Sequence, residues 1–594
     1  MKKKLLVLVA MLLCVVTVLA SCASSMKFEK IVGDGTYNDE NPTLTTAAKV
    51  DVKGEYKYAE GDLALFEDVN AETGVSTYYV YNLATGAVVY TVADSEKTEG
   101  NVTTTVEHEF EFMTQWDTTW FMVFIETVTE TVVEGEEPKE EEHYTVSLRD
   151  AKGAEFATAT DIYDLDDGET VLDLIIYNEK AYRIADDGSI AYAFDYSALR
   201  SVPRVSSKVG DYYYAPIETY SNGPEPIVVG MQVYNSNLEL VAYYEKPSYI
   251  SSDAEAVYKP LNNGNVLIQY SVLENDMAED YTYISDGDKY TLYTFILNVE
   301  KGTSKEISLD YVVEDVYARD ARADYEMDYW KLYGMNQEIE NLAEVYPIEN
   351  ERVNMSASAE KVAVMTNKGK INGMIDGLID NMMPGAIFHV APNRWVVLNH
   401  SYQMFLLNEK GEVLGEISNV DMEELMEAAF EGNGVKPYFI LNDKIYDWDL
   451  AVKYDMHANK ADVVLEMNHG VLMENEDDEL LLYANGTVTT LIAKDVENKK
   501  WSPMLVGMEW NSDYGRNEPV FSTDGFMIRT EVEEGKYKYE FYNDLGAVVL
   551  TLENVVLDQN LYVCSADSTN AFMIKATTIP AEGEEAQTVY YRFG

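Results

Sequence analysis

Six histidines and three cysteines are the side chains best suited to metal binding or nucleophilic catalysis in this chain. No two histidines have the spacing of a zinc-protease helix, and no His/Cys cluster occurs. The chain also lacks a Gly-x-Ser-x-Gly elbow and a phosphate-binding loop. Because isolated histidines are usually structural, the sequence predicts no catalytic residue among His108, His143, His389, His400, His457 and His469.

Carboxylates offer a second chemistry, because a pair of them can act as acid and base in sugar cleavage. With 104 Asp and Glu residues, no single pair stands out. Calcium would suit oxygen ligands in an extracellular protein. Asp164–Glu169 and Asp286–Asp288 are the nearest ligand-like clusters, but neither matches a full calcium loop. Asp-Gly hairpin turns explain both, so no cofactor is identified, and calcium is the alternative.

The segment from Trp501 to Pro519 is the best candidate for ligand recognition. It contains Trp501, Trp510, Tyr514 and Arg516 among amides, and it has no strand periodicity. Aromatic rings beside polar groups are what sugar rings and peptides dock on. The competing interpretation is that both tryptophans pack between sheets. We predict a long ordered loop that binds a ligand, because such loops are often functional.

The N-terminus has the pattern of a secretory signal. Lys2-Lys3-Lys4 precede an apolar run from Leu5 to Leu19, which is shorter than a membrane span of about 20 residues. The sequence Leu19-Ala20-Ser21-Cys22 resembles the lipobox of bacterial lipoproteins. That resemblance implies cleavage before Cys22 and a diacylglycerol thioether on its sulfur. It therefore predicts a signal peptide over 1–21 and a lipid anchor on the extracytoplasmic face of a bacterial membrane.

The charge of the chain excludes one class of partner. With 44 Lys and Arg against 104 Asp and Glu, the formal net charge is −60, which repels nucleic acid and anionic lipid headgroups. Hydrophobic residues make up 47%, so the chain is expected to fold. Apart from Cys14 in the signal and Cys22, only Cys564 remains. It has no disulfide partner, and we expect it to be packed in a strand.

A unit of two strands joined by an Asn/Gly turn recurs along the chain. Examples are Tyr78–Tyr90 and Tyr539–Leu550, and about ten such hairpins occur. A further strand often precedes each hairpin across a polar loop. Such units cannot bury both faces alone, so stacking them radially is favoured. We predict an all-β, β-propeller-like domain over 61–594 with about seven to eight blades, or more blades, or two propellers. The alternative is a series of tandem β-sandwiches.

Two details complete the predicted organisation. A helical insertion is expected at about 325–346, and a shorter helix at 421–430. Because the chain ends directly after a strand, the segment 22–60 is expected to contain the lipidated Cys22, a tether and a strand that closes the last blade. Met26–Val32 and Val50–Tyr58 are the candidates for that strand.

These features favour a membrane-anchored, non-catalytic binding or scaffold module at the cell envelope. Its partners would be the membrane, through the lipid, and an envelope protein or a glycan. A glycan-active hydrolase with paired carboxylates and a solute receptor are the alternatives. A deep pocket with two carboxylates about 5–10 Å apart would favour the hydrolase.

Overall fold

The computed structural model describes most of the chain. The described residues are 27–32, 43–44, 47–60, 63–83, 85–115, 119–134, 137–159, 169–171, 174–177, 179–185, 188–195, 207–220, 226–251, 254–273, 290–318, 321–323, 340–349, 352–353, 360–375, 382–420, 436–511, 516–565, 568–580 and 585–593. Cys22 and the predicted helix at 421–430 lie outside them. No helix in these ranges is long and apolar enough to cross a membrane.

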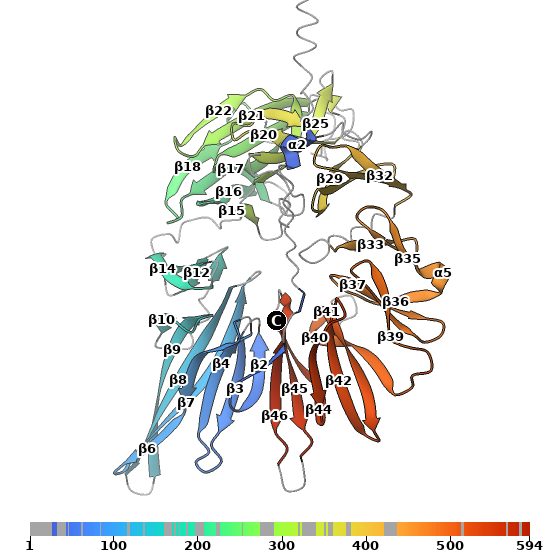
Figure 1. Cartoon of the computed structure of the whole chain (residues 1–594). Coiled ribbons are helices and arrows are strands. Elements are labelled where there is room, and N and C mark those ends of the chain that lie inside the picture. The colour runs from blue at the N-terminus through green and yellow to red at the C-terminus, as the bar shows by residue number, and fades with distance from the viewer. Residues whose placement is uncertain are drawn as a thin grey trace, which may run out of the picture. The chain divides into compact units, whose positions relative to one another are not determined.

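The chain divides into two compact units. The first comprises Met1–Asp39, Ser201–Asn442 and Tyr446–Val452, and the second comprises Glu40–Arg200, Asp443–Ile445 and Lys453–Gly594. Across the described ranges, eleven antiparallel sheets follow one another in chain order (Figure 1). The described helices are only α2 (Phe28–Val32) and α5 (Met456–Asn459).

Four sheets lie in the first unit, and a three-stranded sheet, β33–β35, lies where the chain divides. Their strands are β15 (Ser207–Val209), β16 (Tyr212–Tyr220), β17 (Pro226–Tyr234), β18 (Leu240–Glu245) and β24 (Ala321–Ala323); β19 (Glu255–Pro260), β20 (Val266–Leu273), β21 (Tyr290–Asn298) and β22 (Thr303–Ile307); β23 (Tyr311–Ala318), β25 (Asn341–Glu349), β26 (Arg352–Val353), β27 (Lys361–Met365) and β28 (Ile371–Met374); β29 (Met382–Ala391), β30 (Arg394–Asn399), β31 (Gln403–Leu407) and β32 (Val413–Ser418); and β33 (Tyr438–Leu441), β34 (Lys444–Asp447) and β35 (Val452–Asp455).

Six sheets lie in the second unit. Their strands are β2 (Glu55–Glu60), β3 (Leu63–Val69), β4 (Ser76–Asn82) and β5 (Ala87–Ala93); β6 (Ser95–Glu99), β7 (Val102–Gln115), β8 (Thr119–Glu134), β9 (Glu137–Asp150) and β10 (Glu155–Ala159); β11 (Glu169–Val171), β12 (Leu174–Tyr177), β13 (Lys180–Ile184) and β14 (Ile190–Asp195); β36 (Ala461–Glu466), β37 (Gly470–Asn475), β38 (Leu480–Ala484) and β39 (Thr487–Ile492); β40 (Lys499–Asn511), β41 (Arg516–Glu533), β42 (Lys536–Asn543) and β43 (Val548–Glu553); and β44 (Val555–Ser565), β45 (Ser568–Thr578), β46 (Thr588–Phe593) and β1 (Ala47–Lys49).

The sheets bury both of their faces. In β19–β22, Ile268 belongs to an apolar cluster shared with β15–β18, whereas its neighbour Leu267 belongs to a cluster shared with β23 and β25. In β41, Met527 and Phe526 likewise face opposite neighbouring sheets. Burial on both faces distinguishes propeller blades from β-sandwich sheets, which keep one face for solvent. The fold is therefore all-β with eleven propeller-type blades, more than the seven to eight that the sequence favoured.

A repeated turn explains why hairpins dominate. In at least seven of the described turns, an Asn or Asp side-chain oxygen accepts the backbone N–H groups of the second and fourth following residues. The third following residue is always left-handed, and it is glycine in only three cases. The seven residues are Asp150, Asn235, Asn399, Asn408, Asp447, Asn475 and Asn543.

The last sheet is completed by a strand from near the N-terminus. Strand β1 pairs antiparallel with β46, Ala47 opposite Phe593 and Lys49 opposite Tyr591, and the Val50 N–H donates to the Tyr590 carbonyl at 2.9 Å. β1 lies within the segment 22–60, but it is neither of the two stretches proposed from the sequence. Val50–Tyr58 instead leads into β2, and most of Met26–Val32 forms α2.

Helix α2 packs into the core of the sheet β29–β32. Phe28, Ile31 and Val32 are almost fully buried there, and the Phe28 ring meets Trp395 edge-on at 5.8 Å. A methyl group on Gly411, which has φ +76°, would lie 2.8 Å from the Phe28 Cβ. Burying three apolar side chains contributes roughly 5–8 kcal/mol before the entropy of ordering is subtracted. Such burial fixes a helix too short to be stable alone.

The predicted helical insertion at 325–346 is wrong where it can be examined. Residues 341–346 belong to β25, which lies between β23 and β27, and residues 324–339 lie outside the described residues. Leu342, Ala343 and Val345 are all buried, because a central strand of a blade is covered on both faces. The resulting apolar run has no strict alternation and imitates one face of a helix.

Candidate functional site

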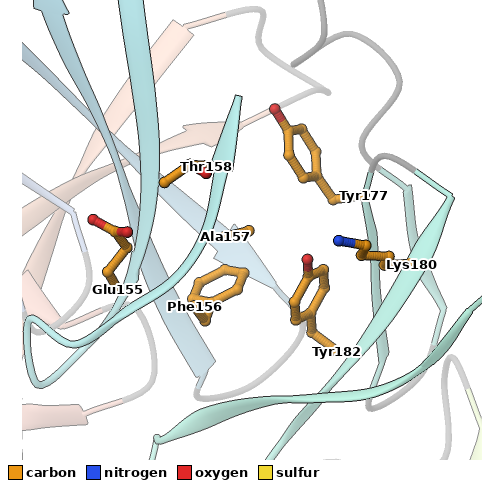
Figure 2. A pocket seen from close by; sticks show the side chains of 7 residues that line it. All are labelled: Glu155, Phe156, Ala157, Thr158, Tyr177, Lys180 and Tyr182. Atoms are coloured by element: carbon orange, nitrogen blue, oxygen red, sulfur yellow. The ribbon is translucent and has the colours of Figure 1, made fainter. Parts of the chain in front are cut away.

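A hollow of about 230 Å³ opens beside strand β10 in the second unit. The turn from β12 to β13 and strand β13 form its opposite side. Figure 2 shows the side chains of Phe156 and Tyr182 close together, with the amino end of Lys180 directed toward β10. The lining residues are Glu155, Phe156, Ala157, Thr158, Tyr177, Lys180 and Tyr182.

Aromatic rings form the apolar part of the hollow. Phe156 and Tyr182 meet edge-on at 5.2 Å, and Tyr182 in turn meets Tyr192 at 6.1 Å. Tyr177 and Tyr182 belong to the buried cluster between β9–β10 and β12–β14, so the floor of the hollow is core. Burial raises the pKa of the Tyr182 hydroxyl, which stays protonated at neutral pH.

Charged groups stand at the rim. Lys180 and Glu155 are both exposed. Arg149 holds the start of β10, because its guanidinium donates to Glu155 Oε2 at 2.9 Å and to the Gly153 carbonyl at 3.0 Å. The same guanidinium lies 4.3 Å from the ring centre of Tyr90, which fixes its orientation. The rim therefore combines one ammonium and one anchored carboxylate.

Size limits what the hollow can accept. Pockets for small molecules usually enclose about 300–1,000 Å³, so this volume suits one side chain rather than a sugar chain or a larger solute. Strand β10 is the edge of its sheet and pairs only with β9 among the described strands. An edge strand presents backbone donors and acceptors to a second strand. The arrangement can therefore bind an extended peptide that places one side chain in the hollow.

A buried histidine lies farther along the same sheet. His108 Nδ1 lies 2.9 Å from Asp94 Oδ1, its Nε2 lies 3.4 Å from Glu126 Oε2, and its ring stacks on Phe124 at 5.2 Å. Its own backbone N–H also donates to Asp94 Oδ1 at 3.0 Å. The side chain is almost fully buried, so these contacts hold the imidazole inside the sheet packing.

Two other histidines, His389 and His469, occupy separate places in the fold. His389 stacks on Trp395 with ring centres 4.5 Å apart, and burial lowers its pKa to about 4. His469 Nδ1 lies 2.6 Å from Asp544 Oδ2, which also accepts the His469 backbone N–H at 3.1 Å. Asp544 is completely buried, so this contact joins two neighbouring blades. The described residues contain no group of three His, Cys, Asp or Glu that could hold a metal.

A cluster of carboxylates lies across β23 and β25 in the first unit. Glu344 stands directly opposite Asp315, whose carboxylate bonds to Lys259 Nζ at 2.7 Å. Burial, followed by the charges of Glu360 and Asp315, raises the pKa of Glu344 to about 7. Glu344 is therefore about half protonated at neutral pH, unlike an ordinary glutamate.

The ligand-binding segment predicted at 501–519 is a hairpin rather than a loop. Trp501 lies in β40 opposite Ile528, where it is half-buried against the cluster that contains Phe526. Trp510 pairs with Asn517, and Arg516 is the first residue of β41. Tyr514 lies outside the described residues. Bulges at Pro503/Leu505 and Leu505/Gly507 shift the register and hide the strand alternation.

This hairpin extends beyond its blade. β42 pairs with β41 only from Gly525 to Glu533, so the residues between Leu505 and Phe521 form a two-stranded arm. Phe521 is exposed near its base. Of the other sequence candidates, Cys564 lies in β44, whereas residues 160–168 and 274–289, which hold most of the proposed calcium ligands, lie outside the described residues.

Sequence reasoning missed the hollow. Its residues come from the β9–β10 and β12–β13 hairpins, which are separated in the chain by strand β11 and by residues 160–168 and 172–173, which lie outside the described residues. One signal was available, since Tyr177, Tyr182 and Tyr192 recur within a short stretch of the sequence.

Comparison with known proteins adds no family. No family model matches the chain, and no curated protein matches it. Among solved structures, BamB from Moraxella catarrhalis is 11% identical, with a TM-score of 0.17 and coverage of 65% of this chain and 98% of that chain. The Dos1 propeller is 9% identical, with a TM-score of 0.19 and coverage of 75% and 88%. Neither superposes on the whole chain, so the propeller assignment rests on the sheets themselves.

Proposed function

We propose that this chain is a lipid-anchored scaffold at the extracytoplasmic face of a bacterial membrane. It binds an extended segment of a partner protein along β10 and performs no catalysis. The observation that carries the proposal is the hollow beside β10, which has an aromatic floor and lies along the edge strand of its sheet among the described strands. Peptides that add a strand gain affinity from the backbone and specificity from such side-chain pockets.

The anchor supplies the location. Cys22 follows the signal-like segment 1–21 in the pattern of a lipobox, and the two acyl chains that this implies would hold the protein stably on a bilayer. With a net charge of −60, the protein would favour partner segments that carry basic residues. No cofactor is needed for this role.

Site-specific photo-crosslinking tests the proposal. A benzophenone amino acid replaces Thr158 on β10 in the full-length chain, and the matched control carries it at Thr490 on β39, which is also an exposed residue of an edge strand. We expect a protease-sensitive adduct at position 158 only, and Lys180→Glu should weaken it. Equal adducts at both positions contradict the proposal. An adduct sensitive to a muramidase instead assigns the hollow to a glycan.

The arm of β40 and β41 is a second proposed contact. Trp510 and Arg516 lie near its tip, beyond the part of the blade that β42 covers. Together with Trp501 and Tyr514 they remain our predicted ligand-binding residues. Shortening the arm by removing residues 507–519 should reduce partner capture while leaving the thermal unfolding temperature nearly unchanged. A large fall in that temperature would show that the arm is structural.

A further inference from the structure

We propose that one end of the sheet β29–β32 is the surface of this protein that rests on the lipid bilayer. The bilayer-facing patch consists of Lys27, Lys30, Lys410, Val413 and Leu414. This inference rests on the proposed lipidation of Cys22, and it adds which part of the first unit the lipid holds against the membrane.

The first step is the position of α2. Phe28 and Ile31 are 2% and 0% exposed, and both belong to the core that includes Trp395. Phe28 contacts the turn between β31 and β32, since any side chain at Gly411 would meet its ring. The chain is therefore fixed to the fold from Phe28 onward, at the end of the blade that carries this turn.

The second step is the length of the tether. Only residues 23–27 separate Cys22 from Phe28. Six residue steps span at most about 20 Å, even when fully extended. A lipid on Cys22 would therefore hold the β31–β32 turn within about 20 Å of the bilayer surface. Without the docking of α2, the tether would run on to β1 at Ala47 and would impose no such limit.

The third step is the surface around the docked helix. Val413 and Leu414 follow the turn directly, and these two adjacent apolar side chains are 51% and 48% exposed. Lys27 and Lys30, which flank Phe28 in the sequence, and Lys410, which lies in the turn that Phe28 contacts, are also exposed. Apolar side chains flanked by lysines suit the boundary between headgroups and acyl chains, where lysine stems lie along the apolar layer.

Local charge agrees with this orientation. Nearby acids are Glu29, Glu409, Glu412 and Asp449, and the last of these is paired with Arg394 at 2.9 Å. Together with the exposed Glu416 of β32, this makes five acidic against four basic side chains, a smaller excess of acid than the 104 to 44 of the whole chain. An anionic bilayer would therefore be repelled less here than by an average part of the surface.

Depth-dependent fluorescence quenching tests the orientation in the full-length lipoprotein. A bimane label is placed at Lys410→Cys or, as the control, at Tyr402→Cys, both in a Cys564→Ser background. Residues 402 and 410 lie at opposite ends of β31, which separates them by about 17 Å. In vesicles of phosphatidylcholine and phosphatidylglycerol with nitroxide-labelled lipid, we expect about fivefold stronger quenching at 410 than at 402. Leu414→Glu should reduce quenching at 410 about twofold.

The outcomes separate the two proposals. If the chain does not float with the vesicles, lipid anchoring fails and the orientation fails with it. If the chain floats but both labels are quenched equally, anchoring stands and the orientation is refuted. Cross-linking of two copies through position 410 without quenching would assign the patch to a second copy of the chain and would also refute the inference.

Discussion

Glu344 is predicted to make the stability of the first unit depend on pH. It lies in the central strand β25, opposite Asp315, with Glu360 and Glu314 nearby. Its carboxyl gives up a proton with a pKa of about 7 in the folded chain, against 4.5 in the unfolded chain. Folding therefore favours the protonated form. The stability that the protonated Glu344 contributes to the folded chain is fully present below pH 4.5 and is lost as the pH rises through 7.

The size of the effect follows from the shift. A difference of about 2.5 between the pKa values of the folded and unfolded chains corresponds to about 3 kcal/mol of unfolding free energy. Because Glu344 is only partly buried, solvent screening reduces this to about 1–2 kcal/mol. Glu344→Gln keeps the shape and removes the charge. At pH 8 the variant should be more stable than the parent by that amount, and at pH 5 the two should differ little.

Urea unfolding of both chains at pH 5, 6, 7 and 8, followed by tryptophan fluorescence, measures this difference. Many carboxylates titrate in this chain, so the quantity of interest is the variant minus the parent. Glu416→Gln on the exposed strand β32 is the matched control and should show no trend with pH. If the free-energy difference for Glu344→Gln is the same at all four pH values, the argument from burial and like charges is wrong.

Three further predictions concern other parts of the chain. Cys22→Ala should abolish acyl labelling and release the protein from the membrane fraction, and persistent labelling would contradict the lipobox interpretation. Ala48→Pro should destabilise the second unit by about 3 kcal/mol in a thermal unfolding assay. Hydrogen-bonded pairs alternate along an antiparallel ladder, so the Val50–Tyr590 bond places Ala48 in a hydrogen-bonded pair of β1 and β46, and proline removes its N–H. Lys49→Pro, at a non-hydrogen-bonded pair, should cost much less in the same assay. Asp544→Ala should cost about 2–3 kcal/mol in urea unfolding, since it removes the buried carboxylate that contacts both the backbone N–H and the Nδ1 of His469. The exposed control Asp462→Ala should be nearly neutral, and equal losses would refute the interpretation.

Local turn chemistry made the hairpins predictable. The pair β42 and β43 was recognisable from Asn543 and Gly546, since the Asn543 side chain accepts the Leu545 and Ala547 N–H groups while Gly546 takes the left-handed conformation. The number of blades was less accessible. Four of the seven turns of this type place a residue other than glycine in the left-handed position, as at Leu238 and Tyr402, so glycine spacing undercounts them.

Features that depend on distant contacts were not predictable. α2 has only five residues and is stable because Trp395 and its neighbours bury it. No local sequence pattern indicates this burial. The strand at 341–349 resembled a helix because both of its faces are covered. The hollow depends on how β10 packs against the β12–β13 hairpin, and local sequence does not encode that arrangement. The lipobox, by contrast, is a contiguous motif and needs no tertiary context.

The pairing of β1 with β46 has a consequence for how the chain reaches its native state. About 540 residues lie between the two strands, yet they share one sheet. In a chain synthesised from its N-terminus, β1 stays unpaired with β46 until the final strand has been made, so this contact of very high sequence separation forms last. A chain that stops before Thr588 leaves β45 as an open edge. Proteases and chaperones can therefore distinguish finished molecules from unfinished ones by that edge.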